Sequence, residues 1–460
     1  MADCRLVTGG GGNRPAGISR ARARKAQDSS VTRADKLRVL VIAEAANPEW
    51  VSVPLIGWSL AQALGRIANI HIVTQIRNRD AFVRAGLVEG VDFTAIDNEA
   101  IARPLWAMGK VLRMGKGKGW TALQAVSAAA YPAFERRVWR LFGDRIKGGE
   151  FDIVHRITPL SPTISSPIAA KCQAAGVPFI LGPLNGGVPW PDAFRAEMRR
   201  EREYLAPLRG AYKMLPGRRA SLAATSAILA GSHHTASEIP AAFQDRLFYL
   251  PENAIDPARF NQVARHDAPR LRVAFVGRMV PYKGPDMLLE AALGLLEAGE
   301  MELDMIGDGP MLNTLKQTVA GKDPGTRLRF HGWLAHEQVQ DVLARATLLA
   351  LPSVREFGGG VVLEAMALGV PPLVVDYAGP GELVREGLGF KVPLSNRASI
   401  VAGFRDQLTT LARQPDLLRE TGKAGRLHVN THFTWDAKAR QIHEIYRFTM
   451  GQTAEKPTLI

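Results

Sequence analysis

Two carboxylates and a glycine triplet stand close together in the stretch Ser353–Glu382. Glu356 and Glu364 are eight positions apart, and the triplet at residues 358–360 lies between them. A short apolar run at residues 348–351 precedes the stretch, and an apolar helical pattern follows the glycines. This order is typical of a loop and a helix N-terminus at the carboxyl end of a parallel strand, where backbone N–H groups and the helix dipole bind anions.

Two cations, Arg278 and Lys283, follow another apolar run at residues 271–277. Arginine can pair two N–H groups with phosphate oxygens, and lysine acts as a compact point charge. A pair of solvated surface cations is the structural alternative. Because this loop and the glycine loop are both expected at the carboxyl edge of one sheet, we favour a diphosphate site.

Each carboxylate has a ligand-binding and a structural interpretation. Glu364 can accept hydrogen bonds from the two hydroxyls of a ribose, or it only stabilises the helix dipole. Glu356 can bind sugar hydroxyls, or stabilise positive charge that develops at an anomeric carbon, or it is a solvated loop acid. The combination with the glycines and the two cations favours the ligand-binding interpretation.

Further candidates follow other predicted strands. His155 is expected to donate a hydrogen bond to a substrate oxygen, with a structural or merely exposed histidine as the alternative. Asn185, Gly186 and Gly187 predict either an oxygen-binding loop on the acceptor side or a simple turn. Backbone groups near Trp333 are expected beside a nucleobase, and its indole in the core. No HxH, DxD or CxxC pattern indicates a metal site.

Apolar runs alternate with helical patterns in both halves of the chain, which predicts βαβ units and parallel sheets. The runs expected as strands are residues 37–43, 70–75, 91–96, 151–158, 177–181 and 226–231, then 271–277, 301–309, 327–333, 347–353, 371–377 and 388–392. We therefore predict an α/β protein with two Rossmann-like domains that face each other across a cleft. The expected boundaries are 37–259 and 271–433, with a final helix in 434–460 that packs anywhere, including on the first domain.

Length, charge and cysteine content limit the classes of protein. A chain of 460 residues is long for a single core, so two domains are expected. Cys4 and Cys172 are its two cysteines, which give no disulfide framework and fit a reducing cytosol. The formal charge of +14 favours anionic partners, whether nucleotide, nucleic acid or acidic membrane.

Two segments bear on membrane contact. Residues 1–36 are basic and glycine-rich without the apolar core of a signal peptide, which predicts a disordered tail. No apolar run is long enough to span a membrane. Residues 101–120 mix Trp, Leu and Met with Lys and Arg. This pattern predicts either a segment that lies on an anionic membrane surface or an ordinary packed helix with a basic face. The arginine-rich segment 193–219 is a second candidate for peripheral attachment.

Together, these motifs resemble the retaining glycosyltransferases of family 4, which have the GT-B fold. EFGGGVVLEAMALGVP is similar to the family's E-x7-E signature, and FVGRMVPYKGPDMLLEA to its Arg and Lys diphosphate loop. GDGP, FHGWL, PENAID and FTWDAKARQIHEIYR are similar to further family patterns. The likeness is dense from Phe275 to Glu382, looser from Leu37 to Asp256, and absent from the first 36 residues.

The resemblance implies where a nucleotide sugar binds. Glu356 is expected beside the hydroxyls of the donor sugar, and Glu364 at the ribose. His155 is expected to meet the sugar from the first domain. The second domain is thus the nucleotide-sugar domain, and the first holds the acceptor.

The same resemblance implies the leaving-group site. Arg278 and Lys283 bind the diphosphate, with help from the N–H groups of Gly358 and Gly359. The two cations supply the positive charge that a metal ion supplies in other enzymes. One departure is the loop after the first strand, EAANPEW, which has no glycine before Gly57 where the family commonly has a glycine-rich loop.

The expected activity is transfer of a sugar, with retention, from a UDP- or GDP-sugar to a glycan, lipid-linked or small-molecule acceptor in cell envelope polysaccharide biosynthesis. No cofactor is expected, and the location is cytoplasmic, with peripheral membrane attachment as a further hypothesis. A sugar-nucleotide epimerase, a phosphorylase and a basic nucleic-acid-binding protein remain alternatives. The last is disfavoured because the basic residues form no recognisable nucleic-acid motif.

Overall fold

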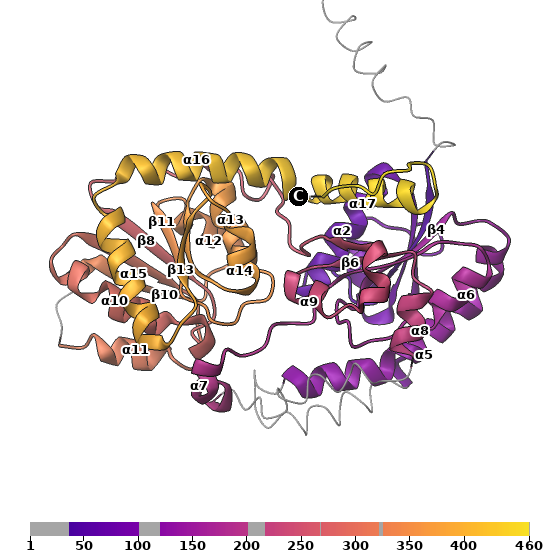
Figure 1. The fold of residues 1–460 in the computed structure, drawn as a ribbon, viewed down its shortest axis with the longest axis horizontal. Coiled ribbons are helices and arrows are strands. Elements are labelled where there is room, and N and C mark those ends of the chain that lie inside the picture. The colour runs from indigo at the N-terminus through magenta and orange to yellow at the C-terminus, as the bar shows by residue number, and fades with distance from the viewer. Residues whose placement is uncertain (1–35, 101–119, 201–216, 267, 322–324, 460) are drawn as a thin grey trace, which may run out of the picture. The chain divides into compact units, whose positions relative to one another are not determined.

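A computed structural model describes residues 36–459 apart from 101–119, 201–216, 267 and 322–324 (Figure 1). Residues 38–460 form one compact unit, and its described part holds two sheets in which every strand pair is parallel. The predicted α/β class with two parallel sheets is confirmed. The predicted tail up to residue 35, the segment 101–119 and residues 201–216 of the arginine-rich segment lie outside the described residues.

The N-terminal sheet has seven strands in the order β3-β2-β1-β4-β5-β6-β7. These are β1 Arg38–Ala43, β2 Asn69–Gln75, β3 Phe93–Ile96, β4 Ile153–Thr158, β5 Phe179–Leu184, β6 Ala227–Ala230 and β7 Leu247–Tyr249. Its central strands are wholly buried, as a parallel sheet with both faces covered requires. The short strand β7 is not expected from the sequence, because three residues are too few to show a pattern.

The helices around this sheet are α2 Val53–Ile67, α3 Arg79–Arg84, α5 Trp120–Lys147, α6 Ile168–Ala174, α8 Arg218–Ala223 and α9 His233–Ser237. A further helix, α7 Arg195–Arg200, comes between α6 and α8 in the sequence but contacts the C-terminal half. Short 3-10 turns lie at η1 Ile76–Asn78, η2 Asp192–Phe194 and η4 Ala241–Arg246. In the arginine-rich segment 193–219, α7 follows the turn η2, and α8 begins at Arg218.

The C-terminal sheet has six strands in the order β10-β9-β8-β11-β12-β13. These are β8 Leu271–Val276, β9 Met301–Ile306, β10 Leu328–Gly332, β11 Leu348–Leu351, β12 Pro372–Asp376 and β13 Phe390–Pro393. Its helices are α10 Pro285–Glu297, α11 Leu312–Thr318, α12 His336–Leu343, α13 Gly360–Leu368, α14 Ala378–Leu383, α15 Arg397–Leu411 and α16 Pro415–His432, with turns η5 Pro281–Lys283 and η6 Gly325–Arg327.

Each sheet has its own apolar core. Phe134 and Phe179 belong to the core of the N-terminal sheet, and Phe275 and Phe404 to that of the C-terminal sheet. Phe194 is an exception, because it comes from the N-terminal half of the sequence and yet packs in the second core. The helix that follows it, α7, contacts η5, and Figure 1 shows α7 at the C-terminal half. The chain around Phe194 therefore packs on the C-terminal half.

The chain crosses between the two halves again at residues 255 and 433–435. The N–H of Ile255 donates to the carbonyl of Phe433 at 2.8 Å, and the N–H of Trp435 donates to the carbonyl of Ile255 at 3.3 Å. After this crossing, α17 Trp435–Thr449 packs against α2 of the N-terminal half, whereas α16 packs against α13 (Figure 1). The final helix thus packs on the first domain, one of the positions that the sequence left open.

A buried hydrogen-bonded pair fastens α17 to the N-terminal sheet. Tyr446 and His155 are both wholly buried, and the Tyr446 hydroxyl donates to Nδ1 of His155 at 2.6 Å. The other ring nitrogen, Nε2, donates to the carbonyl of Gly182 at 2.7 Å. Burial lowers the pKa of His155 to about 4, so the imidazole is neutral at physiological pH.

Tyr446→Phe is expected to lower the free energy of unfolding by about 1–3 kcal/mol, because the buried Nδ1 of His155 loses its donor. Urea unfolding at pH 7 measures the change. Tyr377→Phe is the matched control: its hydroxyl donates to the carbonyl of Pro189 at 2.9 Å, but at an exposed position where water replaces the bond. Equal losses in the two variants would contradict the structural role of the pair.

Candidate functional site

A buried ion pair joins two of the predicted site residues at the carboxyl edge of the C-terminal sheet. Nζ of Lys283 lies 2.6 Å from a carboxylate oxygen of Glu356, and the two side chains are only 15% and 19% exposed. Burial by itself lowers the pKa of Lys283, but the adjacent Glu356 carboxylate outweighs it, so the pKa lies above its ordinary value. The ammonium group is therefore charged in an environment that water reaches poorly.

Two glycines bring Lys283 to this position. Gly277 follows β8 with φ +155°, and a Cβ there would lie 3.0 Å from Cδ of Lys283. Gly284 has φ +66°, and its Cβ would lie 2.5 Å from the carbonyl oxygen of Pro352. Without side chains at these two positions, the loop after β8 packs directly on the loop after β11.

Arg278 lies in the same loop, and its side chain is exposed. It has no ion-pair partner among the residues that the structure describes, and its charge acts on Lys283 as a minor contribution that lowers the lysine pKa. The structure thus brings Arg278 near Lys283, as the sequence predicts, with a guanidinium that an added anion can contact.

The glycine triplet forms the start of α13. Gly359 is the N-cap residue with φ +58°, a conformation that favours glycine, and no side chain caps the helix. The backbone N–H groups of the first turn therefore lack a capping side chain, which makes this end suited to an anion. Glu364 lies one turn further along α13 and is half-buried.

Trp333 follows β10, but its side chain is 72% exposed. The prediction that its indole belongs to the core is wrong. Trp333 is the first residue after the strand, where the chain has already left the sheet. Its position next to apolar residues in the sequence therefore does not bury its side chain. Nothing in the structure tests the predicted contact of its backbone with a base.

The prediction for His155 also needs correction. Its ring is wholly buried, and both nitrogens bond within the protein, to Tyr446 and Gly182. In this structure it has no N–H left to donate to a substrate. The run 151–158 forms a strand as expected, and His155 lies inside β4 rather than at its carboxyl end, so the sheet encloses its ring.

The loop of Asn185, Gly186 and Gly187 is ordered by side chains. The N–H of Gly187 donates to the side-chain oxygen of Asn185 at 3.0 Å, and the N–H of Gly186 donates to the hydroxyl of Thr235 at 3.0 Å. The side-chain amide of Asn185 donates to Oε1 of Glu252 at 2.5 Å. Two backbone donors of this loop are thus bonded within the protein, and its role toward an acceptor stays a prediction.

Glu252 is a functional candidate that sequence reasoning missed. Its side chain is 5% exposed, and burial raises the pKa of its carboxyl to about 7. It belongs to the PENAID motif, which is similar to a family pattern but gives no role for this glutamate. Nothing in the local sequence indicates that the carboxyl is buried, because the residues that bury it lie far away in the chain.

The Glu252–Asn253 dipeptide lies against the glycine triplet. A Cβ on Gly358 would lie 2.0 Å from Nδ2 of Asn253 and 2.3 Å from Oε1 of Glu252. Only a glycine permits so close an approach. The contact brings the loops after β5 and β7 to the N-terminus of α13.

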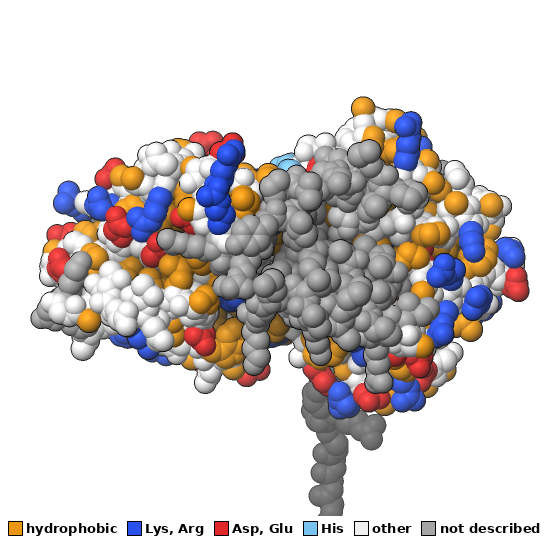
Figure 2. Space-filling view, turned by 90° about the horizontal axis from the view of Figure 1, so that it is seen from below, with side chains coloured by type: hydrophobic (Ala, Val, Ile, Leu, Met, Phe, Trp, Pro, Cys, Tyr) orange, Lys and Arg blue, Asp and Glu red, His pale blue; other side chains and the backbone are white. Residues whose placement is uncertain are grey.

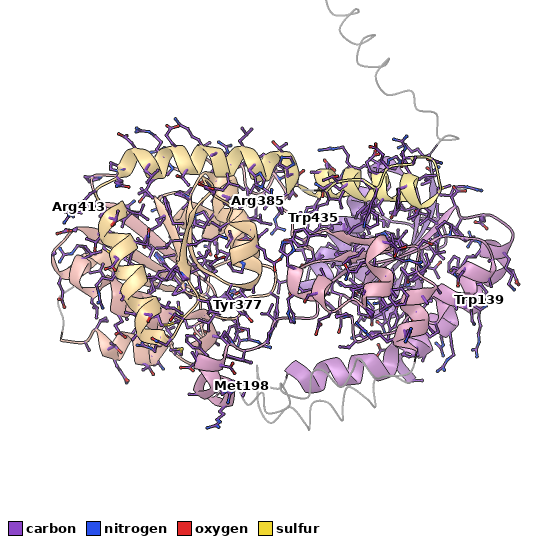
Figure 3. All side chains as sticks on the ribbon, viewed as in Figure 1. Trp139, Met198, Tyr377, Arg385, Arg413 and Trp435 are labelled. Atoms are coloured by element: carbon purple, nitrogen blue, oxygen red, sulfur yellow. The ribbon has the colours of Figure 1, made fainter. Side chains whose placement is uncertain are left out.

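A second group of residues links the halves beside Lys283. The buried Arg355 donates from Nε to the carbonyl of Val188 at 3.2 Å, and its guanidinium lies 5.0 Å above the ring of Trp190. Tyr377, labelled in Figure 3, donates to the carbonyl of Pro189. Residues 188–190 therefore rest on the loops that carry the candidate site. No pattern in the sequence indicates this group.

The described residues contain no cluster of three His, Cys, Asp or Glu side chains of the kind that a metal ion requires. Among the helices of the described part, none is both long and apolar enough to cross a bilayer.

Comparison with known proteins finds a family that part of the chain resembles. Residues 258–428 match the model of "Glycosyl transferases group 1". This part of the chain is therefore similar to group 1 glycosyl transferases. It contains Arg278, Lys283, Glu356 and Glu364, and the predicted likeness to family 4 is confirmed.

Two curated relatives match part of the chain. A GDP-mannose-dependent monoacylated alpha-(1-6)-phosphatidylinositol monomannoside mannosyltransferase of Corynebacterium glutamicum is 28% identical over 51% of this chain and 66% of its own length. A D-inositol 3-phosphate glycosyltransferase of Streptomyces scabiei is 31% identical over 38% of this chain and 41% of its own length. The matched stretches thus cover less than two thirds of either relative.

Solved structures establish the fold. HepE of Anabaena in complex with UDP superposes with a TM-score of 0.57 over 89% of this chain and 99% of its own, at 14% identity. A sucrose-phosphate synthase of Thermosynechococcus elongatus superposes with a TM-score of 0.56 over 91% of this chain and 100% of its own, at 15% identity. The protein has the GT-B fold, as the motifs predict.

Gly358→Ala is expected to disrupt the contact between α13 and residues 252–253, because the new methyl group would overlap Asn253 and Glu252. We expect a loss of about 1–3 kcal/mol in the free energy of unfolding. Gly360→Ala is the matched control: its Cβ would meet no atom closer than 3.8 Å, and it begins a helix that alanine favours. Thermal unfolding of both variants measures the difference, and an equally stable Gly358→Ala protein would disprove the contact.

Proposed function

We propose that the protein transfers a sugar, with retention, from a nucleoside diphosphate sugar to a hydroxyl acceptor. The observation that carries this proposal is the buried Lys283–Glu356 pair beside the uncapped N-terminus of α13. A buried ammonium, a nearby arginine and a helix N-terminus together suit a diphosphate. A carboxylate on the same lysine suits the sugar that the diphosphate carries.

In the mechanism we propose, the diphosphate leaves and the acceptor arrives on the same face of the sugar. The bond from the anomeric carbon to the phosphate oxygen breaks, and its electron pair stays on that oxygen. The acceptor oxygen forms the new bond, and its proton passes to the leaving phosphate oxygen. Arg278 and Lys283 stabilise the charge that develops on the diphosphate, and Glu356 orients the sugar.

The relatives narrow the choice of substrates to test first. One relative is named for GDP-mannose and a phosphatidylinositol mannoside, and another for inositol 3-phosphate. We therefore propose GDP-mannose and UDP-sugars as first donors, and polyol, glycan or lipid-linked alcohols as acceptors. A lipid-linked acceptor would place the enzyme at the cytoplasmic face of a membrane, which flotation with anionic liposomes tests.

A nucleic-acid-binding function has less support. On the face that Figure 2 shows, basic side chains of the described residues stand among acidic and hydrophobic ones. Nucleic-acid-binding proteins instead gather basic residues in one patch or stripe. The motifs that match the family model lie at the carboxyl edge of a sheet, where small ligands bind.

A thermal-shift panel of nucleoside diphosphates and nucleotide sugars tests the proposed function directly. A donor that binds only the folded protein raises its melting temperature. We expect a shift with GDP, GDP-mannose, UDP or UDP-glucose and none with the corresponding nucleosides. The absence of any shift, together with salt-sensitive binding of random RNA, would reverse the ranking of the two functions.

Lys283→Ala and Arg278→Ala are each expected to lower kcat/KM for transfer about 100-fold or more, because each removes a cation from the leaving diphosphate. Lys423→Ala and Arg419→Ala are matched controls on α16, where both cations form exposed ion pairs. Steady-state rates with a radiolabelled donor measure the effect. If both site variants keep full turnover, the proposed mechanism is wrong.

We also expect transfer without a divalent metal, because Arg278 and Lys283 supply the positive charge. Treatment with EDTA followed by gel filtration should leave the rate unchanged. Addition of Mg²⁺ or Mn²⁺ should then give no gain. A rate that disappears with EDTA and returns with either metal would contradict this expectation.

A further inference from the structure

The carboxyl of Glu252 is enclosed by three loops. Oε1 accepts from Asn185 after β5 and lies beside Gly358, where an added Cβ would be 2.3 Å away. Oε2 has no hydrogen-bond partner among the described residues, and a Cβ on Gly231 after β6 would lie 2.5 Å from it. An oxygen that is buried without a partner is costly if the carboxyl is ionised.

The charged and titratable groups around Glu252 come from three elements. Lys438 on α17 attracts its carboxylate, and Glu382 on α14 repels it. The negative charge of Glu252 also helps to raise the pKa of Tyr249 on β7. The hydroxyl of Tyr249 donates to Glu382 at 3.0 Å. Burial lowers the pKa of Lys438 to about 7, and its amine donates to the carbonyl of Pro251 at 2.7 Å. Lys438 is thus a weak counterion near neutral pH.

The position of Glu252 conflicts with the charge of the proposed donor. A diphosphate at the first turn of α13 would place negative charge next to the carboxyl that touches Gly358. An ionised carboxylate would repel it strongly at short range and low dielectric, whereas a neutral carboxyl would not. A neutral carboxyl can still accept the Asn185 hydrogen bond on Oε1 and carry its proton on Oε2.

We propose that Glu252 takes up a proton from solvent when a nucleotide sugar binds at the N-terminus of α13, and that the neutral carboxyl holds the Asn185–Gly187 loop in place beside the donor. This inference rests on the proposed function. It makes Glu252 a positioning residue that couples donor affinity to pH.

The sign of the coupling follows from linkage. Donor binding raises the pKa of Glu252 above its value in the unliganded protein, which is about 7. Below pH 7 the carboxyl is already protonated, so affinity is constant. Above pH 7 each binding event must take up a proton, so affinity falls by up to about tenfold per pH unit.

Isothermal titration calorimetry of the full chain tests this proposal with GDP-mannose and UDP-glucose from pH 6 to pH 8.5. The phosphates of these nucleotide sugars do not titrate in that range. Two buffers of different protonation enthalpy at pH 8 report the number of protons taken up. We expect uptake approaching one proton in the unaltered protein, and a Kd that rises above pH 7.

Glu252→Gln keeps an oxygen for the Asn185 hydrogen bond and removes the titration. We expect this variant to bind without proton uptake and with a Kd that is flat in pH. Glu382→Gln is the matched control, because Glu382 lies near Glu252 but bonds to His233 and Tyr249 instead. This variant should keep the proton uptake and the pH slope, with the onset of the slope shifted to lower pH because a repelling charge is lost.

The possible results separate the two proposals. If neither nucleotide sugar binds the unaltered protein, the proposed function fails and this inference fails with it. If one of them binds without proton uptake, the function stands and the role of Glu252 is disproved, even if the Gln variant does not fold. The same conclusion follows if Glu252→Gln keeps the full pH slope.

Discussion

The arrangement of the site depends on keeping a lysine charged where water is scarce. A buried amine tends to lose its proton, and Lys283 retains it because the carboxylate of Glu356 lies 2.6 Å away. The two residues come from loops on neighbouring strands, β8 and β11, so their meeting requires the parallel order of the sheet and the two glycines that let the loops pack. The candidate site of the C-terminal half is thus arranged around one charge pair.

The second constraint is the glycine at position 358. The approach of Asn253 and Glu252 to its backbone leaves no room for a Cβ, so the residue type and the contact require each other. The same contact brings a buried carboxyl to the helix end that we propose for the diphosphate. Trp435, labelled in Figure 3, helps to fix this region because its N–H bonds to Ile255, three residues after Glu252.

Local patterns predicted the strands well, and their ends poorly. Strands such as Leu271–Val276 and Leu348–Leu351 were predictable because a short apolar run between turn residues is typical of a buried strand. The loop positions of Lys283 and Glu356 followed from them. The errors at His155 and Trp333 came from strand ends, where one or two residues decide whether a side chain lies inside the sheet or outside it.

Residue types and their spacing were enough to establish the α/β class, the parallel sheets, the family likeness and the charged residues at the edge of the second sheet. Each of these depends on periodicity or on residues that are close together in the chain. The pairing of Lys283 with Glu356, the position of Arg355 over Trp190 and the enclosure of Glu252 beside Gly358 emerged only from the folded chain. These contacts join residues that are distant in sequence, and burial, which sets their protonation, is a property of the packed protein rather than of any segment.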